Sequence, residues 1–280
     1  MSQSFSVSVI IPVYNAANYV VSAVNSVIQL VEVKEIILVE DGSPDHALSI
    51  CKELEAKFEK VRVYQHPDGL NEGAGASRNL GVKKATCEFI AFLDADDLYL
   101  PNHFDKAAQV FLSQPDTDGV YGAAGFIEND KVIPNKLYTI RKPVQPDDLF
   151  AALVRGTYGH FTTIGITLRR SVFEKVGYFN TALRLGQDAD LWLRLAYHCK
   201  LRAGELAAPI ALIRRHPENR VRSIDDKVRI VGLQTSISYF KRQDVAFNDY
   251  LVLVAKLFKI YFKHKMFASM LRDLPLLLKI

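Results

Sequence analysis

The sequence predicts an α/β fold in which a mixed, mainly parallel sheet is flanked by helices and followed by a C-terminal helical extension. Three observations support this prediction. Short β-branched runs alternate with segments of helical periodicity over the first third of the chain. The fourth run, EFIAFLD (88–94), is almost wholly apolar, which is typical of a central strand covered on both faces. After about residue 226 the pattern is helical with few turn signals.

The first third divides into four strands and three intervening helices. The strands are expected at 6–13, 35–40, 61–66 and 88–94, and the helices at about 16–30, from after 44 to about 57, and at 75–85. This succession predicts parallel strands joined by right-handed crossovers. In such sheets ligands bind at the carboxyl ends of the strands.

The middle of the chain is less regular. We expect a helix at 101–112, a strand at 119–127, a loop-like stretch at 128–147, and a strand, short helix and turn within 166–179. An amphipathic helix opens at 190–196, and 208–216 contains the last strand.

Composition excludes several classes of protein. The chain has 280 residues and is 49% hydrophobic, so we do not expect disorder. Its three cysteines are far apart in the sequence, so we expect neither a disulfide-stapled module nor a structural zinc site, and we expect a reducing compartment. The beginning of the chain lacks the features of a signal peptide, and no apolar run is long enough to span a membrane. From residue 225 onward there are ten Lys and Arg against five Asp and Glu, whereas 1–224 is nearly neutral. A nucleic-acid-binding protein would instead carry its basic residues on the main domain.

The sharpest chemical signal is Asp94-Ala95-Asp96-Asp97, directly after the fourth strand. Two carboxylates at a strand end suit Mg²⁺ or Mn²⁺, with water and substrate phosphates as the other ligands. Ordinary turn chemistry explains the same residues equally well.

Two further motifs lie at strand ends. Asp41-Gly42-Ser43 follows the second strand and can bind a ribose or base, although capping of the next helix is the simpler explanation. The segment NEGAGASRN (71–79) matches neither the dinucleotide-binding nor the P-loop spacing. Its Arg78 can reach a phosphate or be a solvated helical residue.

Acidic residues and a histidine complete the candidates in the second half. In GQDAD (186–190), either Asp188 or Asp190 can cap the following helix, which leaves the other for general-base chemistry. His216 follows the strand that ends in Arg214-Arg215, and a lone histidine is more often structural than functional.

Taken in order, these motifs resemble those of the family 2 inverting glycosyltransferases of GT-A, Rossmann-like fold. The resemblance runs from about residue 7 to 222 through PVYN (12–15), EDGS (40–43), NEGAGASRN (71–79), LDADD (93–97), GQDADLWLR (186–194) and RRH (214–216). Six motifs in the right order are far more specific than any one of them. The resemblance implies a GT-A domain at 1–224, with a nucleotide-binding half at about 1–98 and an acceptor half at about 99–224, followed by the extension at 225–280.

The resemblance also implies roles for individual residues. A nucleotide diphosphate sugar, most commonly of uridine, would be bound by Pro12, Tyr14, Asn15, Asp41, Arg78, Asp94, Ala95 and Asp96. Asp96 and His216 would hold Mn²⁺ or Mg²⁺, Asp188 would be the catalytic base, and Gln187 and Trp192 would lie on the acceptor side. The family usually has Glu where this chain has Gln187, which removes a negative charge beside Asp188 and so favours its ionised form.

The implied reaction is a single displacement. Asp188 takes the proton of an acceptor hydroxyl as that oxygen attacks the anomeric carbon, and the metal on Asp96 neutralises the leaving diphosphate. The expected acceptor is a sugar or lipid-linked sugar in cell-surface polysaccharide or glycolipid assembly. Two alternatives are a degenerate transferase that only binds nucleotide sugars and a nucleotidyltransferase. The second is disfavoured because the first strand is followed by YNAAN (14–18) rather than by a glycine-rich basic loop.

The C-terminal extension interleaves cations with apolar residues. Its basic residues among Leu, Phe, Ile, Tyr and Met are Lys256, Lys259, Lys263, Lys265 and Arg272. Such a pattern is typical of a helix lying on an anionic membrane surface, and equally of a helix packed on the catalytic domain or on a second subunit. We therefore expect a cytoplasmic protein that contacts either the inner face of the cell membrane or a second copy through 225–280.

Overall fold

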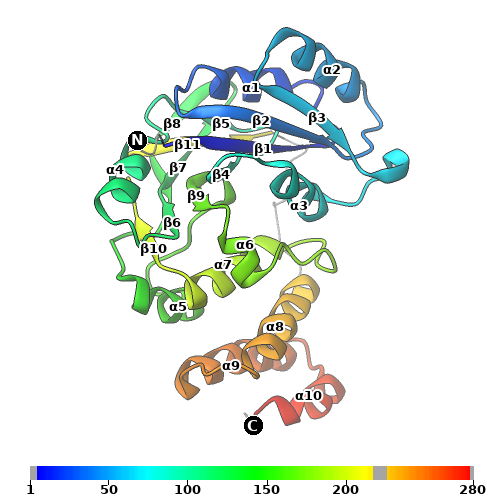
Figure 1. The fold of residues 1–280 in the computed structure, drawn as a ribbon. Coiled ribbons are helices and arrows are strands. Elements are labelled where there is room, and N and C mark those ends of the chain that lie inside the picture. Colours follow the sequence, from blue (N-terminus) through cyan, green and yellow to red (C-terminus); the bar gives the residue numbers. More distant parts are fainter. Residues whose placement is uncertain (1–4, 217–225, 278–280) are drawn as a thin grey trace.

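The computed structural model describes residues 5–216 and 226–277 and confirms the α/β class with a mainly parallel central sheet (Figure 1). The central sheet has seven strands in the order β10-β6-β9-β4-β1-β2-β3. Strands β4, β1, β2 and β3 are mutually parallel, whereas β9 runs antiparallel to both of its neighbours, β4 and β6. The strand bounds are β1 Val7–Val13, β2 Val33–Glu40, β3 Val61–Gln65, β4 Phe89–Phe92, β6 Gly119–Tyr121, β9 Ile166–Arg169 and β10 Leu201–Ala203.

A second sheet of four strands, in the order β5-β11-β7-β8, lies beside the first. Its strands are β5 Leu98–Tyr99, β11 Pro209–Arg215, β7 Ala123–Glu128 and β8 Lys131–Tyr138. The single strand predicted at 119–127 is therefore wrong. It is two strands in different sheets, divided at Gly122, whose backbone N–H donates to the carbonyl of Gly165 at 2.7 Å.

The loop predicted at 128–147 is also wrong in part, because it contains β8. Among the described residues, this strand pairs with β7 alone. It is almost entirely exposed, so it has no apolar alternation by which its sequence could be recognised.

Helices cover both faces of the central sheet. The predicted helices of the first third are present as α1 Val20–Ile28, α2 Ala47–Lys57 and α3 Ala74–Lys84, followed by α4 Asp105–Ser113, α5 Pro146–Arg155, α6 Val172–Val176 and α7 Gln187–His198. Short 3-10 turns occupy Pro67–Gly69, Thr163–Gly165 and Leu274–Leu277. In β1, Val9 and Ile11 join the apolar cluster under α1, α2 and α4, while Ile10 joins the cluster under α3, α5 and α7. Alternate residues thus fill two cores.

The C-terminal segment forms α8 Asp226–Phe240, α9 Phe247–Lys263 and α10 Phe267–Asp273 at one end of the molecule (Figure 1). Helix α8 packs on α7 and α9 packs on α5. Ile237 and Leu253 therefore belong to the same apolar core as Leu149 and Leu191. The boundary expected between 224 and 225 lies outside the described residues. Over the described part of the chain, no helix combines the length and apolarity needed to cross a membrane.

Candidate functional site

The candidate site lies at the carboxyl ends of β1, β2 and β4. Val13 of β1 is in register with Glu40 of β2, and Ile10 with Phe92 of β4, so the segments that follow these strands meet at one edge of the sheet. Asn15 adopts a left-handed conformation with φ 51°, and its backbone N–H donates to Ser43 Oγ at 3.2 Å. The ends of β1 and β2 are thereby tied together.

The acidic motif after β4 is a tight turn, closed by a hydrogen bond from the Asp97 N–H to the Asp94 carbonyl at 3.0 Å. Asp97 is 5% exposed, and its Oδ1 accepts the Arg214 backbone N–H at 2.8 Å. Burial, and then the neighbouring Asp96 and Asp94, raise the pKa of Asp97 well above its ordinary value. Asp97 was not among the predicted site residues. Its role in the structure is to fix the acidic turn to β11.

The structure brings together Asp96 and His216, which are 120 residues apart in the sequence. His216 Nε2 lies 3.0 Å from Asp96 Oδ2, and the His216 ring stacks on Tyr19 with centroids 4.8 Å apart. Arg214 Nε donates to the Asp96 carbonyl at 3.0 Å. Burial, and then Asp94, raise the pKa of Asp96, whereas the hydrogen bond to His216 lowers it.

The donor set at Asp96 and His216 fits a divalent cation that is also bound by its substrate. One carboxylate and one imidazole supply an oxygen and a nitrogen ligand, and phosphate oxygens and water would complete the shell, as is usual for Mg²⁺ at phosphate sites. Within residues 5–216 and 226–277, no cluster of three or more His, Cys, Asp or Glu side chains is placed to hold a metal by itself. Such a cation would therefore depend on the substrate for most of its ligands.

Arg78 and Asp94 form an ion pair at this edge. Arg78 Nη2 donates to Asp94 Oδ1 at 2.5 Å, and its guanidinium carbon lies 5.6 Å from the centre of the Phe179 ring. Arg78 is 6% exposed, whereas the Asp94 side chain is 39% exposed. Arg78 is thus not the solvated helical residue that spacing alone allows. It is buried and orients Asp94.

Asp41 organises the loop that precedes α3. Its Oδ1 accepts the Glu72 N–H at 2.8 Å, and its Oδ2 accepts the Gly73 N–H at 3.0 Å and Asn71 Nδ2 at 3.1 Å. Asp41 itself is 2% exposed. Both carboxylate oxygens are therefore engaged with the 71–73 loop, a role that the sequence pattern did not indicate.

Helix α7 places Gln187 and Asp188 in its first turn. Its N-cap is Gly186, with φ 76°, so the expectation that Asp188 or Asp190 caps the helix is wrong. A glycine suits this position because only the left-handed conformation redirects the chain there. Asp190 instead pairs with Arg194 at 2.7 Å in the protein interior, and Arg194 also donates to the carbonyls of Val176 and Tyr178.

Asp188 is half-buried in the first turn of α7. Its Oδ1 accepts the Ala189 N–H at 2.9 Å. Burial and then the negative charge of Asp188 raise the pKa of Tyr138, at the end of β8. The pKa of His160 is lowered by burial and by Lys256 and raised by Asp188. The charge of the candidate base thus reaches Tyr138 and His160, two residues that sequence reasoning missed. Tyr138 lies in β8, which carries no recognisable strand pattern.

Trp192, which the resemblance implies on the acceptor side, has its side chain in the apolar core. It is 5% exposed, and its ring lies 5.3 Å from Phe161 and 6.2 Å from Phe179 between ring centres. It points inward because it lies on the face of α7 that packs in the core.

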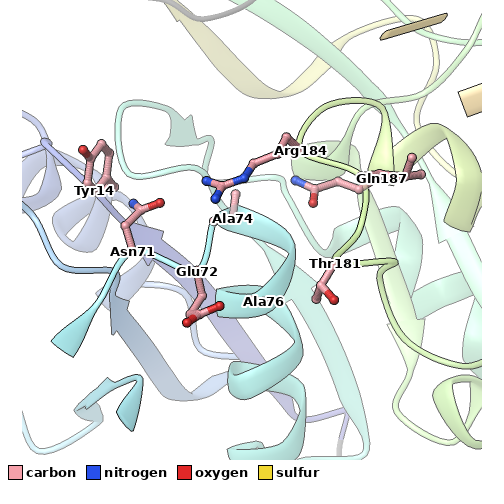
Figure 2. A pocket seen from close by; sticks show the side chains of 10 residues that line it. Tyr14, Asn71, Glu72, Ala74, Ala76, Thr181, Arg184 and Gln187 are labelled. Atoms are coloured by element: carbon pink, nitrogen blue, oxygen red, sulfur yellow. The ribbon is translucent and has the colours of Figure 1, made fainter. Parts of the chain in front are cut away.

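A pocket of about 260 Å³ lies between the first turns of α3 and α7 (Figure 2). Its lining consists of Tyr14, Asn71, Glu72, Gly73, Ala74, Ala76, Thr181, Leu183, Arg184 and Gln187. The lack of a side chain at Gly75 permits the close approach of the two helices, since a Cβ there would lie 2.2 Å from Gln187 Oε1. Of the predicted site residues, Tyr14 and Gln187 line this pocket.

Comparison with known proteins identifies the family. The model of the family described as "Glycosyl transferase family 2" matches residues 8–177, which reach from β1 through β9 and include the acidic turn and the 71–79 segment. The chain belongs to family 2. An uncharacterized family relative from Rickettsia conorii, named as a glycosyltransferase, is 32% identical over 202 residues, which cover 68% of this chain and 31% of the relative. Another from a Nostoc species is 35% identical over 176 residues, covering 61% of this chain and 52% of the relative. The matched region thus spans a third to a half of these family 2 proteins.

Solved structures support the same fold for this family 2 chain. S. aureus TarS 1-349 in complex with UDP-GlcNAc superposes with a TM-score of 0.71 at 19% identity, covering 97% of this chain and 78% of TarS 1-349. The complex of the same protein with UDP gives a TM-score of 0.68. At this level of identity the likeness concerns the fold.

Proposed function

We propose that this chain is a metal-dependent, inverting glycosyltransferase that moves a sugar from a nucleoside diphosphate sugar to an acceptor hydroxyl. The observation that carries the proposal is the pairing of Asp96 with His216 at the carboxyl ends of the strands. The family and the UDP and UDP-GlcNAc bound by TarS support it, and favour a uridine diphosphate donor. Cell-surface polysaccharide or glycolipid assembly is the proposed setting.

The donor would lie across the ends of β1, β2 and β4. Pro12, Tyr14 and Asn15 end β1 and would line the nucleotide, with Asp41 and the loop it anchors beside the base. Asp94, held by Arg78, would face the ribose or donor sugar, and Ala95 keeps the turn compact. Asp96 and His216 would hold Mn²⁺ or Mg²⁺, which when bound supplies positive charge beside the leaving diphosphate.

Asp188 would act as the base. It lies in the first turn of α7, next to Gln187 in the pocket lining, and is half-buried. Its carboxylate would accept the proton of the acceptor hydroxyl as the hydroxyl oxygen forms a bond to the anomeric carbon and the bond to the diphosphate oxygen breaks. One displacement from the opposite face inverts the anomeric centre. The Arg194–Asp190 pair holds α7 in place for this step.

The test measures donor binding and turnover separately. UDP release from UDP-sugars with Mn²⁺ reports turnover, and calorimetric titration with UDP reports binding. We expect Asp188→Asn to abolish turnover and keep UDP binding, and Asp96→Asn to lose the Mn²⁺ dependence of UDP binding. Asp68→Asn, an exposed change outside the site, is the matched control. Retained turnover in Asp188→Asn overturns the assignment of the base. If the original chain binds UDP but turns over none of the UDP-sugars, the result favours a scaffold that only binds nucleotide sugars.

We further propose that the outer face of α9 and α10 docks on an anionic membrane surface. Phe262, Phe267 and Leu271 are 70%, 55% and 67% exposed, and the exposed Lys259 and Lys265 lie on the same two-helix segment. Apolar side chains beside cations match a lipid surface that is apolar below and anionic above. The proposed location of the chain is accordingly the cytoplasmic face of the cell membrane.

Vesicle co-sedimentation tests the docking. The full chain should sediment with vesicles of phosphatidylglycerol and phosphatidylcholine, and Phe267→Ser with Leu271→Ser should abolish sedimentation. Lys52→Gln on the exposed face of α2 should not change it. A dimer in light scattering that the same double variant dissociates, without vesicle binding by the original chain, would show that the face joins two copies and would overturn the membrane proposal.

A further inference from the structure

The pocket between α3 and α7 is built from backbone donors that lack acceptors. Helix α3 begins at Ala74 after Gly73 and α7 begins at Gln187 after Gly186, and no side chain caps either helix. In the described part of the chain, the N–H groups of Ala74, Gly75 and Ala76 have no acceptor outside their own helix. Helix N-termini carry partial positive charge and bind anions. Ala74 and Ala76 line the pocket, so the N-terminal turn of α3 lies at its wall.

Gln187 is a second, independent indication of a ligand. It is 9% exposed, and among residues 5–216 and 226–277 its side-chain amide makes no hydrogen bond to the protein. Figure 2 shows the amide directed into the space between α7 and Ala74. Its N–H groups are therefore open to the pocket, where a bound acceptor group can take the place of water.

Arg184 supplies a full positive charge on the same side. Its guanidinium lies over Ala74, between Asn71 and Gln187, and the Glu72 carboxylate, which also lines the pocket, points away from it (Figure 2). Arg184 is exposed and forms no ion pair with any described residue. Its planar fork can donate two parallel hydrogen bonds to a carboxylate or phosphate.

We propose that this pocket binds an anionic oxygen group, a carboxylate or phosphate, carried by one of the two sugar substrates. Arg184, the Gln187 amide and the free N–H groups of α3 would donate to it. The pocket reaches from Tyr14, at the end of β1, to Gln187, which precedes Asp188 in the same helical turn. A group bound there would therefore belong to the transferred sugar or to the acceptor beside it. This inference rests on the proposed glycosyltransferase function.

The neutral residue at 187 fits this proposal. A glutamate at this position would place a second negative charge in the pocket and repel the anion, as well as remove the N–H donor of the amide. With Gln187 neutral, Glu72 is the one acidic residue among the described residues that line the pocket, and the guanidinium of Arg184 lies over Ala74 (Figure 2).

Calorimetric titration of the full chain with matched probes tests the proposal. To test the donor as the source of the anion, the affinity for UDP-glucuronate is compared with that for UDP-glucose. To test the acceptor, the affinity for glucose 6-phosphate is compared with that for glucose, with UDP and Mn²⁺ present. We expect the anionic member of one pair to bind at least about tenfold more tightly than its neutral counterpart, as charge-assisted hydrogen bonds predict. Arg184→Gln and Gln187→Glu should each remove this preference, and Arg184→Lys should keep part of it.

The control is Arg242→Gln, an exposed change after α8 that should leave both preferences intact. Equal binding of the anionic and neutral members of both pairs by the original chain overturns the inference. So does an Arg184→Gln variant that weakens anionic and neutral probes equally or not at all. If the original chain does not bind UDP at all, the result is a different one, because it refutes the proposed function rather than the anion pocket.

Discussion

Replacing Asp41 with asparagine should destabilise the loop before α3 and the whole domain. In the wild-type chain the two carboxylate oxygens of Asp41 accept the N–H groups of Glu72 and Gly73. Asparagine keeps one of these oxygens and replaces the other with an NH₂ group, which faces a backbone N–H that then has no acceptor. Because a buried amide left without an acceptor costs about 1–3 kcal/mol and the surviving bond loses its charge assistance, we expect a loss of about 2–4 kcal/mol. For a chain of 280 residues that lowers the Tm by roughly 3–7 °C.

The assay combines thermal denaturation with UDP titration. Both the Tm and the affinity for UDP should fall, since Asn71 to Gly73 also line the pocket. Asp68→Asn, which changes an exposed aspartate in the turn before the same loop, should alter neither. A variant of Asp41 with the original Tm and a weakened affinity for UDP would refute the loop-anchoring argument and leave only a direct contact with the base.

Three other predictions concern burial. Burial lowers the pKa of His103 from 6.5 to about 3, so the unfolded chain takes up the proton first and the free energy of unfolding falls as the pH drops below 6.5. At pH 5 this lowers the free energy of unfolding by about 2 kcal/mol. In urea denaturation, the variant His103→Phe should lack this part of the pH dependence. In Gly81→Ala, the new Cβ would lie 2.3 Å from Ile10 Cγ2. The overpacking, reduced by the helical preference of alanine, should lower the free energy of unfolding by about 1–2 kcal/mol, and an unchanged urea midpoint would contradict this. Burial raises the pKa of Cys51 and Cys199 to about 12, so Ellman's reagent at pH 8 should modify neither until the protein unfolds; labelling of the native protein at the rate of a free thiol would show that these sites open.

The sequence was most informative where local pattern and chain order coincide. Strongly apolar runs predict the four parallel strands, and each is followed at once by its polar residues, so the position of Asp41 and Asp94 at one edge follows from parallel pairing alone. The meeting of Asp96 and His216 was predicted only through the family resemblance, since the two are joined by pairing of β11 with β5 and β7 across more than a hundred residues.

The rest of the site depends on contacts that no local pattern records. The hydrogen bonds of Asp41 to the 71–73 loop and the burial of Arg78 against Asp94 are made between segments distant in sequence. Tyr138 could not be foreseen because β8 lies at the edge of its sheet and has neither face buried. The burial of Trp192 could not be foreseen either, because helical periodicity tells which residues share a face but not what that face contacts.

The shared core of the C-terminal helices has a mechanical consequence. Helix α8 rests on α7, whose first turn carries Gln187 and Asp188, and α9 rests on α5 in the same packed layer. A close-packed interior transmits displacement rather than absorbing it. Docking through α9 and α10 would therefore orient the pocket as one rigid body, holding it at a set height and angle above the surface. The distance from the membrane at which the enzyme meets its acceptor would then depend on α9 and α10 as much as on the active site.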